Sequence, residues 1–153
     1  MSSDPKIPET LAQALASALE SGASERVKLQ AQGSSAWVDL KEVGPIGVRV
    51  LGLELEVEDP APPSSQARSL ATPFPGLPGA LSPVEVDDRL GGGLLRSPLR
   101  RGRFIELELR GGRASLRPIA LRERERSATH LDMSREGLGE LLDELAQAME
   151  QAD

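Results

Sequence analysis

The chain has 153 residues and a formal net charge of −6, and because this length is typical of one domain, we expect residues 1–153 to form a single domain. It contains no cysteine, which excludes disulfides, thiolate metal ligands and a cysteine nucleophile. The acidic balance also argues against general nucleic-acid binding, because the neutralisation of phosphates requires a basic surface.

The start of the chain predicts one helix followed by a hairpin. Leucine recurs every four residues between Pro8 and Gly22, which indicates a short helix with one apolar stripe. Hydrophobic and polar residues then alternate over 27–32 and over 36–41, which is the period of a strand. Gly33-Ser34 lies between these two runs and fits a two-residue turn.

A third strand is expected between Ile46 and Val57. Its hydrophobic residues change face near Gly52, which is typical of a bulge or bend. Glu54 and Glu56 alternate along the rest of this strand, a pattern that commonly keeps an exposed edge from aggregating.

Residues 59–83 contain most of the twelve prolines and show little periodicity, so they are interpreted as an irregular or disordered loop. Within the loop, the proline-stiffened run 72–78 is expected to expose Phe74 and Leu77, as short recognition peptides do. These two residues are therefore candidates for binding a partner. The alternative is that Phe74 packs back on the domain.

The second half of the chain contains the clearest hairpin signal. Hydrophobic residues alternate over 105–109 and again over 114–116, with Gly111-Gly112 between them. The returning strand leads into 122–126, where arginine and glutamate alternate. This pattern predicts an exposed extension of the same strand with its three arginines on one face.

The last predicted element is an amphipathic helix. Ser134 is a natural N-cap, and Met133 can pack against Leu138 one turn later. The apolar stripe consists of Leu138, Leu141, Leu142, Leu145 and Met149. We expect this helix to pack on the sheet.

Together these elements predict an α+β fold. The expected architecture is an antiparallel sheet, or a partly closed small β-barrel, of five to six strands. A short N-terminal helix and a packed amphipathic C-terminal helix complete it.

Positive charge is concentrated in one block of the sequence. Residues 96–126 contain ten arginines, no lysine and four glutamates. Arginine matches carboxylates and phosphates through its planar fork, so Arg100, Arg101 and Arg103 are candidates for binding an anion or nucleic acid. The alternative is that the arginines of the block pair with its own glutamates and with the acidic flanks.

Nothing in the sequence favours an enzyme. His130 is the only histidine, so a histidine-based metal site or a serine-histidine triad would depend on one imidazole. The glycines at 91–93 lack the lysine and hydroxyl of a phosphate loop. We therefore expect no catalytic residue and no metal.

Residues 26–48 resemble the centre of a PilZ domain, whose signature there is Asp/Asn-x-Ser-x-x-Gly. Asp39 and Gly44 match this signature, and Lys41 stands in place of the serine. The family's RxxxR would end at Arg26, but Gly22 lies four residues before it, and an RxxxR occurs instead at Arg96-Ser-Pro-Leu-Arg100. The resemblance implies cyclic di-GMP as the ligand, bound weakly or not at all, and Arg26, Asp39, Gly44, Arg96 and Arg100 as the residues that would contact it.

The order of elements also resembles the small acidic homodimeric chaperones of bacterial type III secretion. The leading hypothesis comes from the PilZ resemblance: it is a non-enzymatic regulatory or adaptor module, PilZ-like, that acts through a protein partner. The first alternative is a chaperone-like homodimer that holds an extended protein segment. The second is an anion or nucleic-acid binder that uses the arginine block.

The sequence gives no sign of export or membrane insertion. Met1–Thr10 contains no apolar h-region, and no apolar run approaches the roughly 18 residues that a membrane span needs. A cytoplasmic location is therefore expected, with no membrane partner.

Overall fold

The computed structural model describes residues 7–150, so most of the Met1–Thr10 segment lies outside it. The helices are α1 (Leu11–Glu20), α2 (Pro63–Leu70) and α3 (Arg135–Met149). The strands are β1 (Arg26–Ala31), β2 (Ser34–Val43), β3 (Gly47–Val57), β4 (Ser82–Asp87), β5 (Gly92–Arg96), β6 (Arg103–Arg110), β7 (Arg113–Arg122), β8 (Glu125–Ala128) and β9 (Leu131–Ser134).

The strands form one antiparallel sheet with the order β1-β2-β3-β7-β6-β5-β4. The predicted α+β class is confirmed, but the sheet of the described residues 7–150 has nine strands instead of five or six. It is open, because β1 and β4 are its two ends and do not pair with each other. The predicted alternative of a partly closed barrel is therefore not what the chain forms.

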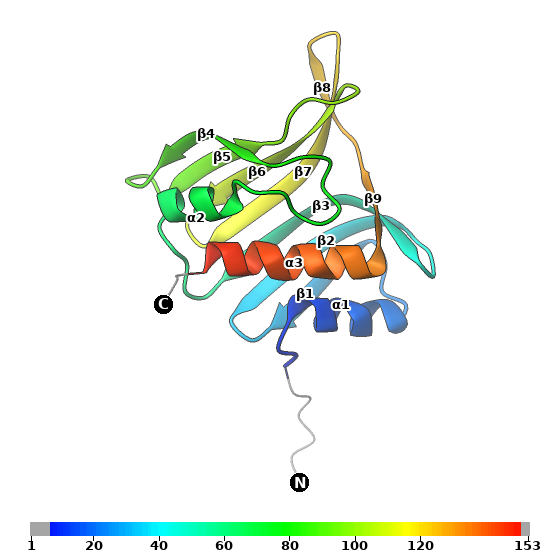
Figure 1. Cartoon of the computed structure of the whole chain (residues 1–153). Coiled ribbons are helices and arrows are strands. Elements are labelled where there is room, and N and C mark those ends of the chain that lie inside the picture. The colour runs from blue at the N-terminus through cyan, green and yellow to red at the C-terminus, as the bar shows by residue number, and fades with distance from the viewer. Residues whose placement is uncertain (1–6, 151–153) are drawn as a thin grey trace.

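The sheet forks where β3 and β7 separate (Figure 1). The first part of β7 pairs with β3, and its last part pairs with β8. The chain then crosses the fork, and β9 pairs with the start of β3. The β7–β8 hairpin consequently projects from one end of the molecule (Figure 1).

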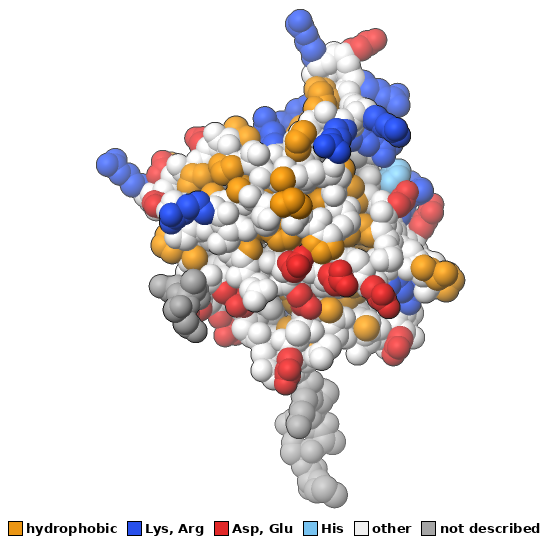
Figure 2. All heavy atoms as spheres, in the orientation of Figure 1, with side chains coloured by type: hydrophobic (Ala, Val, Ile, Leu, Met, Phe, Trp, Pro, Cys, Tyr) orange, Lys and Arg blue, Asp and Glu red, His pale blue; other side chains and the backbone are white. Residues whose placement is uncertain are grey.

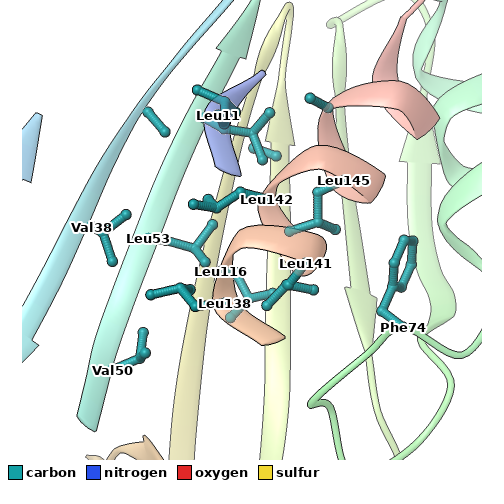
Figure 3. Close-up of a cluster of buried hydrophobic side chains, with 14 of the residues drawn as sticks. Leu11, Val38, Val50, Leu53, Phe74, Leu116, Leu138, Leu141, Leu142 and Leu145 are labelled. Carbon is teal, nitrogen blue, oxygen red and sulfur yellow. The ribbon is translucent and has the colours of Figure 1, made fainter. Parts of the chain in front are cut away.

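One face of the sheet is covered by the helices, with α3 across its middle (Figure 1). The central strands and β1 place buried residues on one face, so their apolar side chains meet those of α3 (Figure 3). Leu138, Leu141, Leu142 and Leu145 are fully buried there. Because the burial of one leucine side chain contributes roughly 1.5–3 kcal/mol, α3 is a main source of stability.

The helix boundaries follow from local chemistry. The Oγ of Ser134 accepts a hydrogen bond from the N–H of Gly137 at 2.9 Å, which confirms the predicted N-cap of α3. Thr10 caps α1 in the same way, by accepting from the N–H of Gln13 at 3.2 Å. The predicted bulge near Gly52 is confirmed by register shifts between β2 and β3.

The segment 59–83, predicted to be irregular, contains helix α2, which its proline-rich composition did not predict. Pro63 occupies the first turn of α2, where its missing N–H costs no hydrogen bond. The expected exposure of Phe74 is also wrong, because this side chain is only 8% exposed and belongs to the core. Leu77 packs partly buried against the same core, so the alternative in which the loop packs back on the domain is the correct one.

The predicted extension of one strand through 122–126 is instead a hairpin. The chain reverses at Glu123-Arg124, and Arg122 lies opposite Glu125. Arg126 lies opposite Leu121, so Arg122 and Arg126 point to opposite faces of the hairpin. They do not share one face as expected.

None of the helices among residues 7–150 has the length and apolar character needed to cross a membrane.

Candidate functional site at the arginine end of the sheet

The ten arginines of residues 96–126 divide into two equal sets according to their partners. In the paired set, each guanidinium lies within 4.0 Å of a glutamate carboxylate on the outer face of the sheet. This set consists of Arg96, Arg110, Arg113, Arg117 and Arg126, which contact Glu106, Glu108 or Glu56. The expected pairing of the block with its own glutamates and with the acidic flanks is therefore correct for half of the arginines: four pair within the block, and Arg113 pairs with Glu56 outside it.

The most buried part of the paired set surrounds Glu106, whose side chain is 16% exposed. One oxygen of its carboxylate accepts hydrogen bonds from Arg96 at 3.0 Å and from Arg126 at 2.6 Å. Both guanidiniums also lie over the ring of Phe104, at 5.7 and 5.5 Å from its centroid. Burial alone would raise the pKa of Glu106, but the bonds from Arg126 and Arg96 outweigh it and lower the pKa.

In the unpaired set, no carboxylate of the described residues lies within ion-pair distance of the guanidinium. This set consists of Arg100, Arg101, Arg103, Arg122 and Arg124, all of them exposed. They belong to the turn before β6, the start of β6 and the β7–β8 hairpin, which lie together at one end of the sheet. We call this region the arginine end. Figure 2 shows blue side chains gathered where β8 projects.

Two tight turns place these arginines. The first links Arg100 to Arg103, whose backbones exchange hydrogen bonds of 2.9 Å, and its central residues Arg101 and Gly102 have φ of 53° and 73°. Positive φ at both central positions is the mark of a type I′ turn, which matches the twist of the strands.

The β7–β8 turn has the same form but contains no glycine. Its central residues Glu123 and Arg124 have φ of 49° and 73°. A side chain in this left-handed region costs roughly 1–2 kcal/mol per residue. Glu123 and Arg124, the two charged residues at the tip of the hairpin, are therefore held in a strained conformation. Backbone strain of this kind is concentrated at functional sites.

A second group of charges borders the arginine end. Arg49 donates a hydrogen bond to Asp132 at 2.9 Å, and this bond lowers the pKa of Asp132, with smaller contributions from His130 and Arg103. Arg103 is therefore close enough for its charge to act on Asp132, although the two do not form an ion pair.

The residues that the PilZ resemblance indicates are not gathered at one place, although two of them are in contact. Arg26 and Asp39 form an ion pair of 3.1 Å on β1 and β2, beside Trp37, which is 36% exposed and 4.6 Å from the Arg26 guanidinium. Gly44 borders an open hollow of about 410 Å³. Arg96 lies five strands from β1 in the sheet order, which corresponds to roughly 24 Å at the usual strand spacing.

Of the four arginines predicted from the block, the structure brings three together. Arg100, Arg101 and Arg103 belong to the arginine end, whereas Arg96 is held by Glu106. Arg122 and Arg124 also belong to the arginine end, although the sequence pattern did not predict them as members of the site. The sequence feature that could have indicated these two arginines is a short charged run directly after a strand, where the chain must turn back.

In chemical terms, the site is a cluster of exposed guanidiniums at one end of an open antiparallel sheet. Within residues 7–150, no group of three or more histidine, cysteine or acidic side chains is placed to hold a metal ion. Exposed guanidiniums without a carboxylate partner offer positive charge and hydrogen-bond donors, the chemical groups that match carboxylates and phosphates. No protein-family model, curated protein or solved structure matches this chain.

Proposed function

We propose that the protein is a non-enzymatic adaptor that docks an acidic segment of a protein partner at its arginine end. The observation that carries this proposal is the division of the arginine block, in which five exposed guanidiniums have no carboxylate partner among the described residues. A guanidinium without a partner keeps its full charge and its donors available for a ligand.

The charge of the whole chain favours a protein partner over nucleic acid. Outside the arginine block the chain carries a large excess of acidic residues, which would repel a long polyanion such as DNA. The fold also leaves no aromatic side chain at the arginine end for base stacking, since Phe104 is 9% exposed and covered by two arginines. A short acidic segment needs neither a long basic surface nor stacking.

A matched pair of triple variants tests the proposal. In the first, Arg100, Arg101 and Arg103 of the unpaired set are replaced by alanine. In the second, Arg110, Arg113 and Arg117 of the paired set are replaced by alanine, so that both variants lose the same charge. The probe is a fluorescein-labelled octaglutamate peptide, and its binding is measured by anisotropy at two salt concentrations.

We expect the first variant to lose about tenfold in affinity, because exposed ion pairs contribute roughly 0.2–1 kcal/mol each and three are removed together. The second variant should bind within about twofold of the wild-type protein, because its guanidiniums are already paired. Equal losses in the two variants would mean that only net charge matters, and the proposed site would be wrong.

The same assay includes a single-stranded oligonucleotide and cyclic di-GMP as competitors. Tighter binding of the oligonucleotide would move the proposal to nucleic acid. Displacement by cyclic di-GMP would instead support the ligand that the PilZ resemblance implies. Light scattering of the same sample gives the mass in solution, and a dimer would support the chaperone-like alternative.

A further inference from the structure

β8 has one paired edge and one free edge. Glu125–Ala128 pairs with β7 alone, and all four residues are exposed. The next strand along the chain, β9, pairs with β3 and does not extend along β8. The free edge of β8 therefore faces solvent beside the arginine end.

The backbone groups on this free edge can be assigned from the hairpin geometry. The N–H of Leu121 donates to the carbonyl of Gly102 at 2.7 Å, so it points away from β8. Leu121 lies opposite Arg126, and this pair is therefore a non-hydrogen-bonded one. Because the two kinds of pair alternate along an antiparallel ladder, the N–H and C=O groups of Arg126 and Ala128 point outward from the sheet.

The edge is held in a fixed position. Arg126 reaches across β7 to Glu106 at 2.6 Å and lies over Phe104. Thr129 donates a backbone hydrogen bond to Pro118 at 3.2 Å, which fixes the other end of the strand. An added strand would therefore bind a preformed template, with little loss of conformational entropy.

The two ends of the sheet order are less suited to this role. β4 contains Pro83 in a run with a register shift, and proline is a common device for blocking an edge strand. β1 lies on the far side of β3 and β2, away from the arginine end. β8 combines an open edge with nearby unpaired arginines, and the positive charge of the adjoining arginine end would discourage pairing with a second copy of this chain.

We propose that the acidic partner segment binds in an extended conformation and adds to the sheet as a strand on the free edge of β8. This inference rests on the proposed function, because the unpaired arginines supply the attraction for acidic side chains. The main-chain groups of Arg126 and Ala128 supply the hydrogen bonds that select an extended segment, as in other cases of strand addition.

A pair of substitutions at Ala128 tests the inference on the full-length protein. Ala128→Pro removes the outward N–H of β8 and leaves the arginines in place, whereas Ala128→Val keeps this N–H. The probe is a labelled peptide of alternating glutamate and valine, eight residues long. A second version of the peptide carries N-methyl groups on alternate residues, which block one of its edges.

We expect Ala128→Pro to weaken binding about fivefold, the equivalent of one hydrogen bond of about 1 kcal/mol. The Ala128→Val variant should bind the peptide as the wild-type protein does. In the orientation that places its methylated edge against β8, the N-methylated peptide should bind more weakly than the unmodified peptide. Amide hydrogen exchange of the wild-type protein should slow at Arg126 and Ala128 when the unmodified peptide is added, which avoids any effect of proline on folding.

The outcomes separate this inference from the proposed function. If the peptide binds, depends on Arg100, Arg101 and Arg103, and leaves the exchange of Arg126 and Ala128 unchanged, then strand addition is wrong and the adaptor proposal stands. If neither acidic peptide binds, both proposals are overturned.

Discussion

The two sets of arginines come from one stretch of sequence and yet have opposite environments. On the outer face of the sheet, Arg96 and Arg126 are bonded to Glu106 and stacked on Phe104. At the arginine end, Arg101 and Arg124 lie in tight turns with no carboxylate partner among the described residues. Residue type therefore does not determine the role of an arginine in this chain, because the difference arises from the strand register.

The comparison also separates stability from binding. An arginine that is bonded and stacked contributes to the free energy of unfolding, whereas an exposed, unpaired arginine contributes little. Substitutions in the two sets should therefore affect different measurements.

The largest effect on stability is expected from Phe104→Ala. This substitution removes the ring beneath Arg96 and Arg126 and leaves a space on the sheet, which should lower the free energy of unfolding by about 3 kcal/mol. Urea denaturation measures the change, and Arg101→Ala is the control, expected to stay within about 0.5 kcal/mol of the wild-type protein. Equal effects of the two substitutions would contradict the division into two sets.

A smaller and pH-dependent effect is expected from Glu106→Gln. The pKa of Glu106 in the folded protein is lowered from its ordinary value of 4.5, so the ionised carboxylate stabilises the fold above that pH. This stabilisation is lost as the pH falls through the folded value, because both states then bind the proton. The variant should be less stable by about 1–2 kcal/mol at neutral pH.

The measurement is the difference in unfolding free energy between wild type and Glu106→Gln, from neutral pH down to about pH 3. The difference should shrink as the solution becomes more acidic. A difference that stays constant over this range would show that the charge of Glu106 does not contribute to stability.

The smallest effect is expected at the β7–β8 turn, and it has the opposite sign. Replacing Glu123 by Asn and Arg124 by Gly supplies the residues that a type I′ turn prefers, and should raise the free energy of unfolding by about 1 kcal/mol. Gly102→Ala is the matched control in the other turn, where φ is 73°, and should lower stability by a similar amount. A destabilised double variant would mean that Glu123 or Arg124 makes a contact that offsets the strain.

The features that the sequence predicted well are local. The hairpin at Gly111-Gly112 and the N-cap at Ser134 each depend on residues a few positions apart, so a short window of sequence contains the whole signal. The same holds for the apolar stripe of α3, since its period is set by the helix itself.

The features that the sequence did not predict are of two kinds. α2 was missed because its prolines resemble a loop, although one of them begins the helix. The partners of the arginines depend on strand pairing over long distances in the chain, as in the ion pair of Arg113 with Glu56. A charge pattern cannot show which arginine finds a partner until the register of the sheet is known.

The position of α3 across the middle of the sheet has a consequence for how the chain acquires its structure. Each of the nine strands described within residues 7–150 precedes α3 in the sequence, and a ribosome adds roughly 5–20 residues per second. The strands that form the apolar face are therefore synthesised seconds before α3, the helix that covers this face. Until α3 is complete, the strands that it covers expose apolar side chains, and a transiently exposed surface of this kind makes a partly folded chain prone to aggregation.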